Sequence, residues 1–279
     1  MSPILDDMDS RPGSTTSLLR TVVGLYLRRV GDWMSIADLI ELMEQLDVPA
    51  PRTRTAVVRL KKKELLIPKT VDRVVGYQLN ADAAVMLGRG DRRIFNARTM
   101  GPDDAWCVIS FSLPEELRHL RHQLRRRFYW IGCGMVSPAL WICPDFLADE
   151  VEDILLDLEI RGHATLFRTE RPRVSGSLLD AVAEWWDLTE LEALHREFIR
   201  EVTPLVTDEA VEPAEAFARY IRGVDTWRVI PYLDPGLPYD LMPADWPGAE
   251  STRLFGELSD RYASAAWSYV AGVDAAVRA

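Results

Sequence analysis

Cysteine and histidine are scarce in this 279-residue sequence, which has three cysteines and four histidines. The cysteines, Cys107, Cys133 and Cys143, are odd in number and lack the spacing of metal ligands. The sequence therefore indicates neither a disulfide framework nor a zinc site. We expect reduced thiols in the core of a cytoplasmic protein. No Gly-x-Ser-x-Gly motif, phosphate-binding loop or catalytic Cys/His pair is present, and we expect no cofactor.

Long hydrophobic runs are also missing. No uninterrupted apolar stretch approaches the ~20 residues that span a bilayer, so we expect no membrane contact. The first residues are acidic, with Asp6, Asp7 and Asp9, and have no apolar core, which argues against a signal peptide. In contrast, 48% of the residues are hydrophobic and nine are tryptophan. This composition is typical of folded globular structure, and the length suits two or three domains.

Acidic residues are nearly absent from residues 50–80, although the whole chain carries a formal charge of −10. Eight cations in this segment stand against two acids, Glu64 and Asp72, so the local charge is +6. A basic patch on an acidic body predicts a protein that meets phosphate through that patch alone. The negative charge of the remaining sequence disfavours nonspecific binding to nucleic acid.

Residues 50–64 have the pattern of a short amphipathic helix. Pro51 suits the first turn, where a missing N–H costs nothing. At about 100° per residue, one narrow face collects Thr53, Ala56, Val57 and Leu60. The opposite face carries Thr55, Val58, Arg59 and Lys62, with Arg54 and Lys61 on its flanks. Such a helix fits the major groove of DNA, which is about 12 Å wide, but taken alone it is equally a solvated basic helix.

The flanking segments favour DNA binding. Apolar periodicity predicts helices at residues 18–28 and 36–46 before the basic helix, with Ser35 and Asp38 as a weak capping box. Two strands, at residues 65–67 and 73–79, follow it. Three helices and a hairpin predict a winged helix-turn-helix over residues 16–92, after a flexible tail at 1–15, with the basic helix in the recognition position. A short helix at 81–87 and a break at Gly88–Arg93 mark the domain edge.

Residues 93–175 predict a central ferredoxin-like domain. The expected elements are a strand at 106–111, a helix at 114–128, strands at 135–136 and 139–142, a helix at 149–159 and a strand at 164–167, in the order βαββαβ. The outer side of the first helix collects Arg118, Arg121, Arg125, Arg126 and Arg127. We favour a solvated face over a phosphate site for these arginines. His119 and His122 have no third ligand at a suitable spacing, so we expect no metal.

Residues 176–279 predict a helical C-terminal domain, so the expected fold class is α+β. Between its helices, residues 227–248 form a loop with five prolines that also carries Trp227, Tyr232, Tyr239 and Trp246. So long and rigid a loop must be packed. It either lies against its own helices or forms one wall of a pocket, and the pattern does not decide between them.

The chain resembles the PaaX family, bacterial repressors of phenylacetate degradation, over nearly its whole length from Leu18 to Tyr269. The residues that carry the resemblance are Gly24–Arg28 with Trp33, Arg54–Leu60, Gly90–Phe95, Trp130–Gly132, Pro138–Ile142, Pro231–Pro235 and Leu241–Gly248. The resemblance implies a homodimeric repressor on palindromic operator DNA. It also implies release by a small effector, an aryl-acyl-CoA thioester such as phenylacetyl-CoA in the founding members. Two departures concern the wing: Glu64 stands where the family often has glycine, and residues 70–75 are less basic and less glycine-rich.

The predicted DNA contacts fall into two groups. The residues expected to face base edges are Arg54, Thr55, Val58 and Arg59, since arginine pairs with guanine and valine can meet a thymine methyl. The residues expected to hold phosphates and set the register are Arg52, Lys61, Lys62, Lys63 and Arg73. An anionic effector favours arginine, but the sequence does not choose among Arg196, Arg200, Arg219, Arg222, Arg228 and Arg253, so the effector-binding residues stay unknown.

Two alternatives remain. The central domain also resembles small CRISPR-associated nucleases, which need an aspartate at the end of the first strand to hold a metal. Residues 108–112 have none, and Asp103 and Asp104 precede the strand. We therefore expect a regulator and not an enzyme. The other alternative is a DNA-bound scaffold that takes no ligand.

Overall fold

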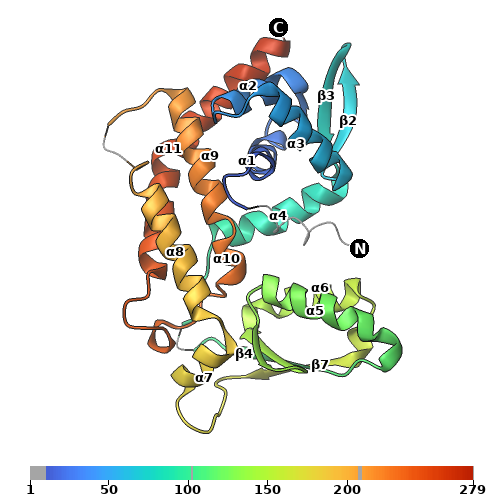
Figure 1. Ribbon diagram of the computed structural model, residues 1–279, viewed down its shortest axis with the longest axis vertical. Coiled ribbons are helices and arrows are strands. Elements are labelled where there is room, and N and C mark those ends of the chain that lie inside the picture. The colour runs from blue at the N-terminus through green and yellow to red at the C-terminus, as the bar shows by residue number, and fades with distance from the viewer. Residues whose placement is uncertain (1–10, 102, 207–208, 279) are drawn as a thin grey trace.

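The computed structural model describes residues 11–101, 103–206 and 209–278, with the side chains of residues 85, 86, 89 and 275–278 left out. The protein is a mixed α+β structure with helices and two antiparallel sheets. Figure 1 shows the first sheet and its helices at one end, the second sheet with its own helices at the other, and the C-terminal helices alongside both.

The N-terminal unit contains three helices and three strands. They are α1 (Thr15–Val22), which continues into a π-helical turn (Val23–Leu27), β1 (Trp33–Ser35), α2 (Ile36–Glu44), α3 (Ala50–Lys62), β2 (Leu66–Val71) and β3 (Val74–Leu79). The predicted capping box is present, because Ser35 Oγ accepts from the Asp38 N–H at 3.0 Å and the Ser35 N–H donates to Asp38 at 3.2 Å. The strands lie in the order β1-β3-β2.

The hairpin differs from its prediction in two ways. Strand β2 runs on through Pro68 to Val71, so the predicted loop shrinks to a two-residue turn. Pro68 is tolerated because β2 is an edge strand, where a missing N–H removes no ladder hydrogen bond. Strand β1 was not predicted; it is three residues long and pairs Trp33 with Gln78.

Helix α4 (Ala81–Phe95) runs through the segment predicted as a break, Gly88–Arg93, and that prediction is wrong. Tertiary contacts support the helix there. Asp91 accepts from Arg28 at 2.7 Å, and Gly90 lies so close to Tyr232 that a Cβ would stand 2.6 Å from the tyrosine oxygen. Glycine is therefore used at position 90 for close packing and not to end the helix. In Figure 1, α4 extends from the N-terminal unit toward α10.

The central unit follows the predicted order of elements. They are β4 (Trp106–Phe111), a 3₁₀ turn (Glu115–Leu117) leading into α5 (Arg118–Trp130), β5 (Gly134–Ser137), β6 (Leu140–Pro144), α6 (Ala148–Asp157) and β7 (Ala164–Thr169). The strand order is β5-β6-β4-β7, and every neighbouring pair is antiparallel. Helices α5 and α6 lie on one face of the sheet (Figure 1). All three cysteines are buried free thiols.

The C-terminal unit is helical. It contains α7 (Leu178–Trp185), α8 (Leu188–Val202), α9 (Pro213–Trp227), α10 (Ile230–Leu233) and the long α11 (Gly248–Arg278). The proline-rich segment includes α10 and a 3₁₀ turn at Tyr239–Leu241, so it is partly helical. It both packs against its own helices and lines cavities, so the two possibilities left open by the sequence hold together.

The N-terminal and C-terminal units share one hydrophobic core. Tyr26 of the π-helical turn packs on Phe217 of α9 and stacks with Trp267 of α11. Within this core, the buried carboxylate of Asp225 on α9 accepts from Ser17 Oγ at 2.6 Å and Thr21 Oγ1 at 2.8 Å. The position of α1 is therefore set by residues more than 200 positions later in the sequence.

Gly76 in β3 is predicted to be intolerant of a side chain. A Cβ at this position would lie 2.6 Å from the ring of Trp33 and 2.5 Å from the carbonyl oxygen of Met34. Because the carbonyl belongs to the paired strand, we expect Gly76→Ala to destabilise the fold by about 1–3 kcal/mol in chemical denaturation. Gly88→Ala is the control, since no described atom outside its own helix lies within 4 Å of the added Cβ. It should be neutral or gain up to about 1 kcal/mol, and equal stability of the two variants would contradict this account.

Candidate nucleic-acid interface

Helix α3 has the two faces that its sequence predicts. Its buried residues are Thr53, Ala56, Val57 and Leu60, the four expected on the apolar seam. Pro51 lies in the first turn, after the N-cap Pro49. Small side chains on the seam let α3 approach α1 closely, and Leu60 anchors its last turn in the core.

The opposite face of α3 is open to solvent. Of the nine predicted DNA contacts, eight are exposed, namely Arg52, Arg54, Thr55, Val58, Arg59, Lys61, Lys62 and Arg73, and Lys63 is half-buried. Eight of the nine lie on or directly after α3, and Arg73 is at the tip of the hairpin that follows. In Figure 1 the hairpin stands beside α3.

Val58 is an apolar exception on the charged face of α3. Val58 is 50% exposed. Its exposure to water is unfavourable in the isolated protein, and contact with an apolar group of a partner would remove that unfavourable exposure. Next to it, the Thr55 hydroxyl donates to the Pro51 carbonyl of its own helix at 3.0 Å. That bond uses the hydroxyl proton, so outward from the helix Thr55 presents its methyl group and an acceptor oxygen.

Two of the basic side chains make contacts within the protein. Arg59 Nη1 donates to Thr16 Oγ1 of α1 at 3.3 Å, and Lys61 Nζ lies 6.0 Å from the ring centroid of Tyr77 in β3. Both contacts are long for their type and involve neutral partners. They orient the two cations without neutralising them.

The tip of the hairpin is a two-residue turn. Val71 pairs with Val74, and between them Asp72 and Arg73 have φ of 47° and 69°. Positive φ at both central residues is the type I′ geometry, which usually takes Asn-Gly or Asp-Gly. Arg73 therefore has a left-handed backbone conformation, which is less strained for glycine than for arginine. The strained residue carries a positive charge at the most protruding point of the hairpin.

Glu64 ends the basic helix in a left-handed conformation with φ of 56°. The Leu65 N–H donates to the Leu60 carbonyl at 3.0 Å and the Glu64 N–H donates to the Lys61 carbonyl at 3.0 Å, the pattern of a Schellman cap. The residue after the C-cap in this motif is usually glycine. The departure noted at Glu64 therefore has a conformational cost, and it places an acid directly after Lys63 at the end of the basic helix.

Sequence reasoning missed two contributors to this surface. Trp33 covers Gly76, and its indole N–H donates to the Lys69 carbonyl at 3.1 Å, which fixes the hairpin against β1. Lys69 itself is exposed on β2. A tryptophan two residues before the N-cap Ser35 was the signal for β1, but three residues are too few for a periodicity to show.

The arginines of α5 are mostly engaged within the protein. Arg118 pairs with Glu115 at 2.9 Å, Arg121 donates to the Leu113 carbonyl at 2.7 Å and Arg125 to the Pro138 carbonyl at 3.0 Å. Arg127 was expected on the outer side, and that expectation is wrong. It is buried, its pKa is lowered by burial, and Asp157 lies 3.6 Å away.

Two further predictions concern metals and membranes. Among the described residues, no group of three or more His, Cys, Asp or Glu side chains is placed to hold a metal ion. No helix in the described ranges is both long and apolar enough to cross a membrane.

Comparison with known proteins gives matches along most of the chain. Three family models match in succession: "PaaX-like protein" at residues 14–83, "PaaX protein central Cas2-like domain" at 100–178 and "PaaX-like protein C-terminal domain" at 186–272. A curated relative, the transcriptional repressor PaaX of Escherichia coli (strain K12), is 28% identical over 267 residues, which cover 93% of this chain and 84% of that protein.

One solved structure has the same overall fold. The uncharacterized protein Rv0674 from Mycobacterium tuberculosis superposes with a TM-score of 0.54 and 19% sequence identity, covering 88% of this chain and 94% of that chain. At this identity the likeness concerns the fold alone.

Position 64 gives a test of the helix cap. We expect Glu64→Gly to raise the free energy of unfolding by about 0.5–1 kcal/mol, because glycine adopts the left-handed conformation without a Cβ clash. Glu64→Ala removes the same charge but keeps the Cβ, so it separates conformation from electrostatics. In urea denaturation the glycine variant should be the more stable of the two, and the reverse order would refute the cap assignment.

Proposed function

Because the chain belongs to the PaaX family, we propose that it is a DNA-binding transcriptional repressor that binds operator DNA through α3 and the β2–β3 hairpin. The observation that carries the proposal is the outer face of α3. It exposes cations from Arg52 to Lys62 around one apolar side chain, Val58, on a chain whose net charge is −10. Phosphates are attracted by the cations, while base edges are read by the residues at the centre. The E. coli relative, a transcriptional repressor and not an enzyme, supports a regulator over the nuclease alternative.

We infer the finer architecture from the order of elements. Residues 16–92 would form a winged helix-turn-helix, with β1, β2 and β3 as the wing sheet. Residues 93–175 would form a ferredoxin-like domain, and residues 176–279 a helical domain. The order β5-β6-β4-β7 on the connection βαββαβ supports the second of these, as does the match to a Cas2-like domain.

A repressor of this kind would act in the cytoplasm as a homodimer on a palindromic operator, and a small effector would release it. Two recognition helices must enter major grooves about 34 Å apart, or a multiple of that distance. A modest rotation between the two copies would therefore break the register. A coupling of ~1–3 kcal/mol between effector and DNA is typical of such systems.

Arg54 is predicted to read a base. An operator can be obtained by selecting bound duplexes from a random-sequence pool. On that operator we expect Arg54→Ala to cost ~1–3 kcal/mol and to relax specificity at one position, because arginine pairs bidentately with guanine. Gel-shift titration against single-position operator variants measures both effects. Undiminished affinity of the Arg54→Ala protein would refute the base contact.

Lys62 is predicted to hold a phosphate. Lys62→Ala should weaken binding to every sequence alike and should flatten the dependence of log affinity on log salt concentration by about one unit. Arg118→Ala, a loss of charge on α5, is the control and should leave the slope unchanged. If the control changed the slope as much as Lys62→Ala, the DNA footprint would have to include α5.

A further inference from the structure

A cavity of about 540 Å³ lies where the three units of the chain meet. Its walls come from α1, α4, the central-unit helices α5 and α6, α9 and α10. This volume is within the range of sites for small organic ligands, about 300–1,000 Å³. Several of its lining residues belong to the Gly90–Phe95 and Pro231–Pro235 segments that carry the family resemblance.

Two nearly buried guanidinium groups line this cavity with unused donors. Arg228, with 7% of its side chain exposed, donates through Nε to Asp225 at 3.2 Å and through Nη2 to Ser17 at 2.7 Å. Its Nη1 has no hydrogen bond to any described residue. Arg93, 11% exposed, uses Nη2 for the Ile131 carbonyl at 2.9 Å, and its Nη1 is buried without a hydrogen-bond partner in the described chain. Unused buried donors are costly, so an oxygen brought to them stabilises the site.

The hydroxyl of Tyr232 lies among these cations. The Arg93 guanidinium is 5.3 Å from its ring centroid. Burial raises the pKa of Tyr232 and the charge of Glu150 acts in the same direction, while the charges of Arg20, Arg93 and Arg228 lower it. No described residue forms a hydrogen bond with this hydroxyl. One end of the cavity therefore gathers the guanidinium groups of Arg93 and Arg228 and the Tyr232 O–H donor, with Glu150 beside Arg93.

Acidic side chains line the cavity too, but three of them have cations of their own. Glu150 lies 3.4 Å from Arg93, Asp157 3.6 Å from Arg127 and Asp91 2.7 Å from Arg28. Asp82 and Asp149 are exposed, and Asp153 is half-buried and has a partner within the protein. The unused hydrogen-bonding groups inside the cavity, on Arg93, Arg228 and Tyr232, are donors, and donors favour an anionic ligand.

We propose that this cavity is the effector site, and that an oxyanion of a small organic effector, a carboxylate or a phosphate, binds between Arg93, Arg228 and the Tyr232 hydroxyl. The proposal rests on the proposed function as a DNA-binding repressor. It also resolves the choice among six arginines. Arg228 alone of the six lines the cavity, whereas Arg196, Arg200, Arg219, Arg222 and Arg253 form ion pairs with acids elsewhere.

Contacts continue from the site to the recognition helix. Arg228 and Asp225 bind Ser17 of α1, and α1 packs on α3, where Thr16 accepts from Arg59. From the same helix α9, Arg222 pairs at 2.6 Å with Asp47 in the turn before α3. A ligand oxygen bound to Nη1 would draw the Arg228 guanidinium toward the cavity and weaken its hydrogen bonds to Asp225 and Ser17, so α3 would move relative to the C-terminal unit. Such a change in α3 position is the two-state element that release requires.

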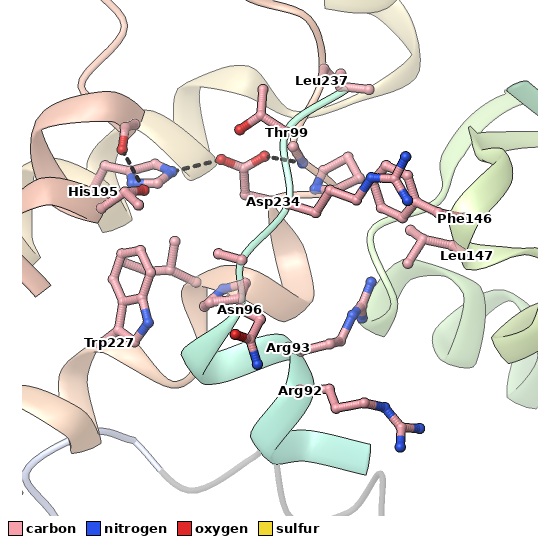
Figure 2. Close-up of a pocket in the computed structure, with 18 of the residues that line it drawn as sticks. Arg92, Arg93, Asn96, Thr99, Phe146, Leu147, His195, Trp227, Asp234 and Leu237 are labelled. Carbon is pink, nitrogen blue, oxygen red and sulfur yellow. Dashed lines mark hydrogen bonds and ion pairs between the residues drawn. The ribbon is translucent and has the colours of Figure 1, made fainter. Parts of the chain in front are cut away.

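The neighbouring cavity, of about 150 Å³, is a weaker candidate. Figure 2 shows His195 facing Asp234, and Arg92 and Arg93 directed from α4 toward the central unit. His195 Nδ1 lies 2.6 Å from Ser251 Oγ, and Nε2 lies 2.8 Å from Asp234 Oδ2. Because Ser251 also donates to the Gly248 carbonyl at 2.9 Å, these side chains bind one another and leave little capacity for a ligand.

The test measures ligand binding and DNA binding separately on the full chain. Isothermal titration would use three probes: sodium phosphate, sodium phenylacetate and phenylacetyl-CoA. The first two distinguish a phosphate site from a carboxylate site. The variants are Arg93→Gln and Tyr232→Phe, the second of which removes only a hydroxyl without a described partner. Arg118→Gln on α5 is the matched control.

We expect at least one probe to bind the parent. We also expect Arg93→Gln and Tyr232→Phe each to weaken that probe about tenfold, the loss for one hydrogen bond to a charged group, and the control to bind like the parent. Parent-like affinity in both variants, or no binding of any probe to the parent, would overturn the oxyanion site. Because two different variants are measured, the test still stands if one of them fails to fold.

Operator binding with and without saturating probe completes the test. Release of DNA by a probe whose binding depends on Tyr232 supports the effector site, and unchanged operator affinity would overturn it. If the parent bound no DNA sequence at all, the proposed function would fail, while the titrations would still decide whether the cavity holds an oxyanion.

Discussion

The buried carboxylate of Asp225 is the constraint on which the arrangement of the N-terminal unit depends. It accepts hydrogen bonds from Gly13, Ser17 and Thr21 and from Arg228 on its own helix. A buried charge is stable only when it is paired and fully hydrogen-bonded, so α1 and α9 must keep these positions together. Because α1 also supports α3, the presentation of the basic helix is a property of the whole chain and not of its first 80 residues.

Charge distribution explains how an acidic protein can bind a polyanion. The cations of α3 are held outward because the opposite face of the helix, a seam of small and apolar residues, is buried. The arginines of α5, by contrast, are mostly committed to Glu115 and to backbone carbonyls. Two stretches with similar composition therefore differ in what they offer to a partner.

The proline-rich segment connects all three units at close range. Tyr232 packs against Gly90 of α4, the carbonyls of Tyr232 and Leu233 would lie 3.1 and 3.2 Å from a Cβ on Gly132 of the central unit, and the Gly236 carbonyl accepts from Met100 at 2.8 Å. Contacts at this spacing need glycine on one side and a rigid backbone on the other. Such close contacts would transmit movement of one unit to the others, as the proposed ligand site beside this segment requires.

The sequence by itself determined the buried and exposed faces of α3, the order of strands and helices in the central unit and the Ser35 cap, because each depends on local periodicity or on hydrogen bonds within a few residues. Tertiary structure alone decided the rest. It carried α4 through Gly88 and Gly90, extended β2 across Pro68, added β1, buried Arg127 and gathered Arg20, Arg93, Arg228 and Tyr232 around one cavity. The extension of β2 follows from its pairing with the adjacent strand β3. In the other cases the deciding partner is distant in the chain, and local patterns hold no information about it.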